Sequence, residues 1–279
     1  MTKRALFVHA HPDDETINNG ATMAQMIEDG VAVTLVTCTR GEEGEVLVPE
    51  LTHLASSAED KLGFHRITEL ANAMKVLGVK DHRFLGAYRD SGMMGTPQNE
   101  HPNCFWRADV ELAAKELAAI INEVKPQVMV TYDENGGYGH PDHIQTHRVA
   151  MRAAEIANWQ ITKIYWNIMP KSVVQKGMDA MKAQGSDFFG AENVDDLPFV
   201  KDDSFVSAVI HAPSQVDKKM AAMKAHATQI SLDGPFFALS NNLGVQVFGD
   251  EYYTLVKGEK AGPLSTDNLE QDLFAGIEI

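Results

Sequence analysis

The residues best suited to chemistry form two short stretches that share the tripeptide His-Pro-Asp. The first, AHPDDE at residues 10–15, contains one histidine and three carboxylates, and the second, GHPDH at 139–143, contains two histidines. Histidine and carboxylate side chains are common ligands of catalytic zinc, which keeps three protein ligands and one open position. The two stretches are therefore candidates for the two halves of one metal site.

Each stretch also has the composition of an ordinary helix start. Proline suits the first helical position, and acidic residues in the first turn interact favourably with the helix dipole. If His11 and His140 are the N-caps, Asp14 and His143 are the third helical residues, and side chains at these two positions meet. Two histidines gain nothing from the dipole at a helix N-terminus. The two stretches together therefore favour a metal site built on helix starts.

The ligand chemistry points to a catalytic metal. His11, Asp14 and His143 would supply two histidines and one carboxylate, and a zinc ion held in this way lowers the pKa of a water ligand to about 7. The same ligand set suits Fe2+, so the sequence leaves Zn2+ and Fe2+ both open. Structural zinc sites are mostly made of cysteine, and the only cysteines, Cys38 and Cys104, are distant in the sequence.

Hydrophobic periodicity predicts the elements that position these residues. We expect strands at 5–10, 31–37, 82–86 and 127–132, separated by helices at 15–29, 57–77 and 107–124. This order predicts an α/β fold, a Rossmann-like and mostly parallel sheet with helices on both faces. Ligands of such sheets bind beyond the carboxyl ends of the strands. Both His-Pro-Asp stretches fall there, as do the loops at 40–53 and 86–105.

The pattern is weaker beyond residue 166. Strands are expected at 205–212 and 252–256, and a helix at 214–230. We divide the chain into a Rossmann-like, metal-binding catalytic core at 1–165 and a smaller α/β C-terminal region at 166–279. We expect the C-terminal region to form a mixed cap that walls the active site.

Composition excludes several classes of function. The chain has 279 residues, of which 44% are hydrophobic, and a formal net charge of −15. This balance disfavours nucleic acid and anionic membranes as partners, because both attract clustered Lys and Arg. No apolar run approaches the roughly 20 residues of a membrane span, and the first residues lack the apolar core of a signal peptide. We expect a cytoplasmic protein that acts on a small molecule, with an oligomeric state that the sequence leaves open.

Taken together, the motifs resemble the LmbE/PIG-L-like family of zinc-dependent sugar N-deacetylases. The resemblance covers nearly the whole chain and rests on FVHAHPDDE, NGAT, VTCTRGEEGEV, YRDSGMMGT, VTYDENGGYGHPDH, HATQ and LSNN. Within the family, these motifs are similar to those of the members that act in mycothiol biosynthesis. The resemblance implies hydrolysis of the acetamide of N-acetylglucosaminyl-inositol to the free amine and acetate.

The resemblance also implies a role for each site residue. His11, Asp14 and His143 would hold the metal, and Asp13 would be the general base. A charged His140 would stabilise the oxyanion and protonate the leaving amine, and Tyr138 would donate a hydrogen bond to the same oxyanion. The residues that would bind sugar and inositol hydroxyls are Arg66, Asp90 and Glu45.

Two other functions are compatible with the sequence. A mycothiol S-conjugate amidase shares the metal motif and cleaves a larger amide of the same sugar core. The stretch DDETINNGAT and the SGMMGTPQN loop favour the deacetylase. A non-catalytic sugar-binding protein with a vestigial metal site is the second alternative. Asp13 and Tyr138 argue against it, because neither residue is needed as a ligand.

Overall fold

The structure is a computed structural model of the whole chain, and it describes residues 2–183, 185, 190–231 and 249–278. The LSNN motif at 239–242 lies outside the described residues. No helix among the described residues is long and apolar enough to cross a membrane.

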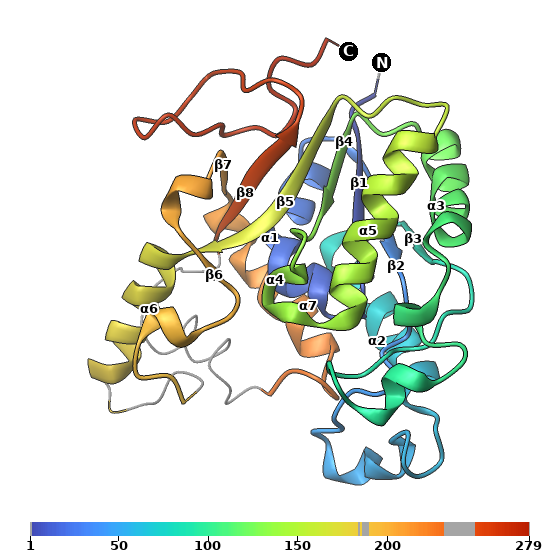
Figure 1. Cartoon of the computed structure of the whole chain (residues 1–279). Helices are drawn as coiled ribbons and strands as arrows, with labels where there is room; N and C mark the ends of the chain where they lie inside the picture. The colour runs from blue at the N-terminus through green and yellow to red at the C-terminus, as the bar shows by residue number, and fades with distance from the viewer. Residues whose placement is uncertain (1, 184, 186–189, 232–248, 279) are drawn as a thin grey trace.

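A single mostly parallel sheet organises the molecule (Figure 1). Its strand order is β3-β2-β1-β4-β5-β8-β7, and β6 pairs with β5 away from this path. The first five strands in this order run parallel, whereas β8 is antiparallel to β5 and to β7. The strands are β1 (Arg4–His9), β2 (Ala32–Thr37), β3 (Asp81–Phe84), β4 (Val128–Thr131), β5 (Lys163–Pro170), β6 (Val200–Lys201), β7 (Ala208–His211) and β8 (Asp250–Lys257). The Rossmann-like α/β fold predicted from the sequence is confirmed.

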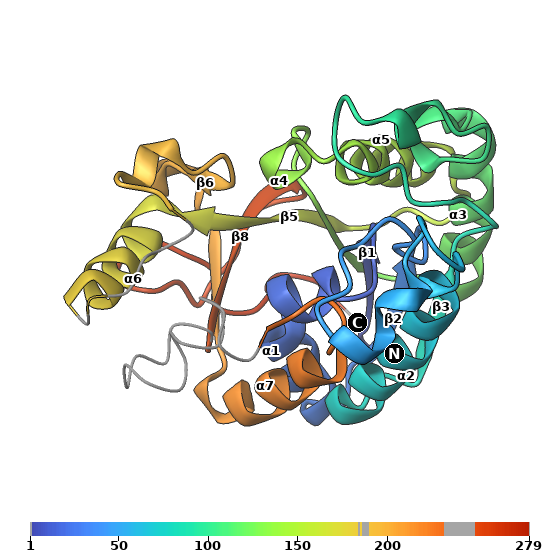
Figure 2. The same ribbon diagram turned by 90° about the horizontal axis from the view of Figure 1, so that it is seen from below.

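Helices cover both faces of the sheet (Figure 2). Helices α1 (Asp14–Glu28), α2 (Leu62–Leu77) and α7 (Val216–Ala225) lie on one face, and α3 (Val110–Val124) and α5 (Pro141–Ile156) lie on the other. Two hydrophobic cores fill the spaces between the layers. Strand β1 is covered on both sides, so Ala5, Leu6, Phe7 and Val8 are fully buried.

The C-terminal region adds strands to the sheet and a further helix beside them. Helix α6 (Lys171–Ala183) packs beside β6 with a small apolar cluster of its own. Strands β7 and β8 return to the main sheet and extend it beyond β5. The proposed boundary at residue 165 falls within β5, and the division into core and C-terminal region stays a prediction.

Most predicted elements are present, with shifted ends. The helix expected at 57–77 begins at Leu62, and residues 49–54 form a 3-10 helix where a loop was expected. The helix expected at 107–124 begins at Val110, after Asp109 caps its first turn with a hydrogen bond from the Glu111 N–H at 2.8 Å. Strand β5 was not predicted, since polar Lys163 and Asn167 interrupt its apolar pattern.

Candidate active site

The nine predicted site residues lie around one cavity of about 1050 Å³. The cavity opens at the carboxyl ends of β1 and β4, where the strand order reverses direction and open α/β sheets bind their ligands. His11 follows β1, and the turn that carries Tyr138 and His140 follows β4. The cavity-lining set contains His11, Asp13, Asp14, Glu45, Arg66, Asp90, Tyr138, His140 and His143.

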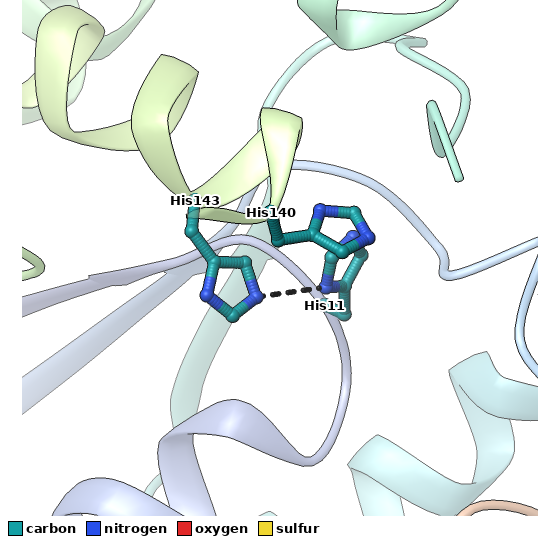
Figure 3. Close-up of side chains that lie close together, drawn as sticks. All are labelled: His11, His140 and His143. Carbon is teal, nitrogen blue, oxygen red and sulfur yellow. Dashed lines mark hydrogen bonds between the residues drawn. The ribbon is translucent and has the colours of Figure 1, made fainter. Parts of the chain in front are cut away.

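Three of these residues present a set of atoms with the spacing of metal ligands. His11 Nδ1, Asp14 Oδ2 and His143 Nε2 are each 3.3 Å from the other two. Ligand atoms about 2.0–2.1 Å from a tetrahedral zinc ion are roughly 3.3–3.4 Å apart. Figure 3 shows the His11 and His143 rings meeting at these nitrogen atoms. The three residues therefore fit a metal ion.

The remaining nitrogen of each ligand histidine is already engaged. His11 Nε2 lies 3.1 Å from Asp142 Oδ2, and His143 Nδ1 lies 3.1 Å from the Gly136 carbonyl oxygen. Such partners set the orientation of a metal-binding imidazole. Asp142 is fully buried and is the one acid of the second His-Pro-Asp stretch, GHPDH. It was missed as a site residue, although its repetition in both stretches could have singled it out.

The ligand atoms of His140 also lie within 4.8 Å of those of His11 and His143. His140 caps α5, however, and its Nδ1 accepts the Asp142 N–H at 3.2 Å, as expected for an N-cap. The predicted arrangement of the second stretch is therefore confirmed, with Pro141 first in the helix and His143 third. Asp14 is the better third ligand, since its oxygen is 3.3 Å from both partner nitrogens.

The prediction for the first stretch was wrong about the helix start. Helix α1 begins at Asp14, and its N-cap is Asp13 rather than His11. His11 and Asp14 still meet, because the His11 N–H donates to Asp14 Oδ2 at 2.9 Å. The chain turns sharply at Asp13, with φ 120° and ψ −37°, a conformation rarely adopted by L-residues. Such a residue stores about 1–3 kcal/mol of strain, and the surrounding contacts must hold it in place.

Arg66 from α2 is one of those contacts. Its guanidinium donates to Asp13 Oδ2 at 3.0 Å, to the Gly41 carbonyl at 2.8 Å and to the Pro12 carbonyl. Burial raises the pKa of the Asp13 carboxyl to about 6, and the charge of Arg66 only partly opposes this rise. Among the described residues, Asp13 Oδ1 has no hydrogen-bond partner. This oxygen is therefore available to accept a proton.

His140 and Tyr138 lie beside the ligand histidines. Burial, together with His11 and His143, lowers the pKa of His140 to about 3, so the imidazole is neutral near pH 7. Because Nδ1 is an acceptor, the ring proton of the neutral form sits on Nε2. This environment does not favour the charged His140 that the resemblance implies. The Tyr138 ring is 5.0 Å from the ring of His143 and is 40% exposed.

The expected substrate-binding residues occupy different environments. Asp90 is buried 3.6 Å from His11 Nε2, and its oxygens accept the N–H groups of Gly92 and Glu43 at 2.8 and 3.2 Å. The Glu45 side chain is exposed at the cavity, and its backbone carbonyl accepts a hydrogen bond from Gln229. Arg66 is only 2% exposed and already donates to the protein. Contact of these three residues with substrate hydroxyls stays a prediction.

The comparison with known proteins identifies the family. A family model described as PIG-L: GlcNAc-PI de-N-acetylase matches residues 6–154. The chain belongs to this PIG-L family. A relative in Geodermatophilus obscurus, named 1D-myo-inositol 2-acetamido-2-deoxy-alpha-D-glucopyranoside deacetylase, is 56% identical over 292 residues, which span 99% of this chain and 98% of the relative. The resemblance seen in the sequence is confirmed.

Solved structures share the PIG-L fold at much lower identity. The 4-carboxy-2-hydroxymuconate hydratase GalB from Pseudomonas putida has a TM-score of 0.63 and 21% identity, with 95% of this chain and 100% of that chain covered. The N,N'-diacetylchitobiose deacetylase from Pyrococcus horikoshii has a TM-score of 0.58 and 20% identity, with coverage of 92% and 84%. At these identities the likeness establishes the fold alone, since a hydratase and a deacetylase share it.

Proposed function

We propose that this chain is a metal-dependent deacetylase that hydrolyses the acetamide of N-acetylglucosaminyl-inositol to the free amine and acetate, as a step of mycothiol biosynthesis. The observation that carries the proposal is the set of three candidate ligand atoms 3.3 Å apart, with Asp13 in the wall of the same cavity. The 56% identity to a named GlcNAc-inositol deacetylase over 99% of the chain supports the substrate. We expect the enzyme to work in the cytoplasm.

His11, Asp14 and His143 would hold the ion, which we assign as Zn2+, with Fe2+ as the alternative that the same ligands allow. When bound, such an ion acts as a Lewis acid that activates water for attack on the amide. Asp142 and the Gly136 carbonyl keep the two imidazoles oriented through hydrogen bonds to their outer nitrogens.

The other residues move protons and stabilise charge. Asp13 takes a proton from the attacking water and gives it to the leaving amine, so the amine leaves uncharged and Asp13 is again a carboxylate. The second proton of the water stays on the carboxyl product, which becomes acetate when it loses this proton to solvent. A carboxyl whose pKa is about 6 suits both halves of this transfer. The Nε2–H of neutral His140 and the hydroxyl of Tyr138 donate hydrogen bonds to the oxyanion. Donors of this kind are each worth about 3 kcal/mol.

One observation favours amidase action as a second activity. The C-terminal region supplies an apolar part of the cavity wall, including Met169, Leu197 and Phe199. An apolar wall suits the thiol substituent of a mycothiol S-conjugate better than it suits a sugar hydroxyl. We therefore keep S-conjugate amidase activity as the alternative function.

Measuring acetate release tests the proposal. Zinc-loaded protein should release acetate from N-acetylglucosaminyl-inositol, lose this activity after chelation and regain it when metal is restored. The rate on a mycothiol S-conjugate, measured in parallel, ranks the two activities. A non-catalytic sugar-binding protein would bind the disaccharide without releasing acetate, and that result from fully loaded protein would refute the proposal.

A further inference from the structure

Glu15, the third acid of AHPDDE, has no part in the reaction described above, yet it is completely buried. Its Oε2 accepts the Asp13 N–H at 2.9 Å, and its Oε1 accepts hydrogen bonds from His226 Nε2 at 2.9 Å and Thr16 Oγ1 at 2.6 Å. An acid that serves only to complement the helix dipole gains nothing from burial. A carboxylate removed from water needs a cationic partner and a full set of hydrogen bonds. Glu15 has both.

His226 lies 211 residues after Glu15 in the sequence and contacts it directly. It begins the HATQ motif, caps the end of α7 and is also fully buried. Its carbonyl accepts the N–H groups of Gln229 and Ile230, so the HATQ segment turns back on itself. Thr228 of the same turn is fixed to Glu69 on α2 by two hydrogen bonds of 2.8 and 2.7 Å. The imidazole is therefore held against Glu15 by a turn that is anchored elsewhere.

The residue at the end of this chain of contacts is the strained Asp13. Its N–H is held by Glu15, and its carboxylate is held by Arg66. Its carbonyl accepts the N–H groups of Thr16 and Ile17, at 3.0 and 2.9 Å. Helix α1 fixes the carbonyl in this way, but a residue with φ 120° needs its N–H side fixed as well. Among the described residues, the Asp13 N–H is bound by the Glu15 side chain alone, and Arg66 holds the Pro12 carbonyl of the same peptide unit.

We propose that Glu15 and His226 are positioning residues that hold the Asp13 backbone in its strained conformation and thereby aim its carboxylate at the reacting water. The inference rests on the proposed function, in which Asp13 moves the proton. Proton transfer depends steeply on distance, and a misplacement of about 1 Å can lower a rate by about 100-fold. Loss of either residue should therefore reduce turnover while the three metal ligands stay in place.

Glu15→Gln and His226→Leu test this, because both nearly preserve side-chain volume. Glu15→Gln leaves one acceptor oxygen for three donors, and His226→Leu removes the donor that orients Glu15. We expect each variant to lower kcat about 10- to 50-fold, with KM and the bound zinc per protein unchanged. His226→Gln keeps a donor and should retain kcat to within about threefold. Wild-type kcat in both Glu15→Gln and His226→Leu would overturn the inference.

Glu251→Gln is the matched control. Glu251 is also a buried carboxylate. It accepts hydrogen bonds from the backbone N–H groups of Ala21 and Thr22 in α1 and from the Lys219 ammonium group in α7. The N–H groups that it binds lie about two turns further along α1 than Glu15. Its loss should lower the melting temperature without lowering kcat. A kcat loss in this control equal to that of Glu15→Gln would mean that general destabilisation, not positioning, explains the effect.

A double-mutant cycle with Asp13→Asn separates the inference from the proposed function. If His226 acts through Asp13, His226→Leu should cost less than about twofold in the Asp13→Asn background. An equal loss in both backgrounds contradicts positioning. If Asp13→Asn alone retains full activity, the proposed role of Asp13 has failed instead.

Crystal structures of the wild type and of His226→Leu give a test without activity. The wild-type protein should show a positive φ at Asp13, and the variant should show Asp13 relaxed to negative φ or its carboxylate displaced. An unchanged Asp13 in the variant would contradict the inference.

Discussion

At the scale of single residues, the surroundings of three adjacent acids, Asp13, Asp14 and Glu15, shift the pKa values of their carboxyls in different directions. Burial disfavours the charge of Asp14, but His143 and His11 outweigh it and hold the pKa of its carboxyl well below the usual value. Burial raises the pKa of Asp13 to about 6, although Arg66 opposes the rise. For Glu15, His226 outweighs the effect of burial and lowers the pKa. Position relative to positive charge, rather than residue type, separates the three.

Replacing a candidate metal ligand and replacing the proposed general base should affect zinc binding differently. Asp13→Asn should keep about one zinc per protein and lose about 10²- to 10⁴-fold in kcat, because it removes proton transfer only. Asn tolerates positive φ better than most residues, so the loop should survive. His143→Ala should lose the metal as well. Zinc analysis and acetate release on both variants check this, and full activity in Asp13→Asn would contradict it.

Asp142 should act on the metal through His11. In Asp142→Asn the His11 Nε2 loses its carboxylate partner at 3.1 Å, and zinc affinity should fall about 10- to 100-fold. A competition titration against a chromophoric chelator measures this. Glu111→Gln, which removes an exposed partner of Arg152, is the control and should leave the affinity unchanged. Equal affinities for Asp142→Asn and wild type would count against an orienting role.

The candidate ligand residues could be singled out from the sequence because their spacing within each stretch is short. His11 and Asp14 are three residues apart, and so are His140 and His143. Their partners could not be predicted in the same way. His226 is 211 residues from Glu15, and Asp142 is 131 residues from His11. Neither contact corresponds to a recognisable spacing in the sequence, because each depends on how α7 and α5 pack against the sheet.

At the scale of elements, an ion pair joins β6 in the C-terminal region to the turn that follows β4. Lys201 Nζ on β6 lies 2.6 Å from Asp133 Oδ2. Asp133 Oδ1 in turn accepts the N–H groups of Asn135 and Gly137, at 3.1 and 2.8 Å. Gly137 directly precedes Tyr138, so the pair links the C-terminal region to the turn that carries the expected oxyanion donor.

Lys201→Met should therefore impair catalysis without affecting the metal. We expect kcat/KM to fall about 3- to 10-fold, a fraction of the value of one oxyanion donor, and zinc content to stay the same. Lys171→Met is the control, because Lys171 pairs with an exposed aspartate of the same region, Asp195, and exposed pairs contribute little. Steady-state kinetics on the two variants test this prediction. Equal kcat/KM values for Lys201→Met and Lys171→Met would show that the Lys201–Asp133 pair does not affect catalysis.

The elements themselves were predictable to different degrees. Strands β1, β2 and β4 are mostly apolar runs because both faces of the sheet are covered there, and this pattern is visible in the sequence. The start of α1 was not predictable, because side-chain contacts from Arg66 and Glu15 impose the unusual φ of Asp13. Strand β5 could not be predicted from the sequence for a similar reason. Its Lys163 is buried only because Glu270, 107 residues later, pairs with it.

At the scale of the whole molecule, that pair fixes the C-terminal segment to the sheet. Glu270 Oε1 accepts hydrogen bonds from Lys163 Nζ at 2.6 Å and the Ala261 N–H at 2.8 Å, and Oε2 accepts one from the Tyr165 hydroxyl. Both charged side chains are nearly or fully buried. The cluster lies on the part of β5 that precedes Asn167, Ile168 and Met169, which line the cavity.

Breaking this pair should lower stability rather than catalysis. Glu270→Gln leaves the Lys163 charge buried without its partner, which costs about 3–5 kcal/mol. Urea unfolding at neutral pH measures the loss, and zinc content and kcat of the folded variant should match the wild type. Asp272→Asn, which removes the exposed pair with Lys3, should cost less than about 1 kcal/mol. Similar losses in the two variants would mean that burial is not the cause.

The pH dependence of stability should report another buried pair, Glu15 with His226. Burial opposes the charge of His226, but Glu15 outweighs it and raises the pKa of the imidazole. A histidine whose pKa is higher in the folded state stabilises that state fully below its unfolded value of about 6.5. This contribution is lost as the pH rises through the folded pKa.

His226→Gln keeps the hydrogen bond and removes the titration. The wild type should therefore exceed this variant in free energy of unfolding by more at about pH 6 than at about pH 9. Urea unfolding of both proteins at the two pH values measures the difference. His211→Gln removes an exposed histidine pair with Asp250 and controls for surface charge, which contributes little. A wild-type advantage that is equal at both pH values, or larger at pH 9, would show that His226 is not held as a cation by Glu15.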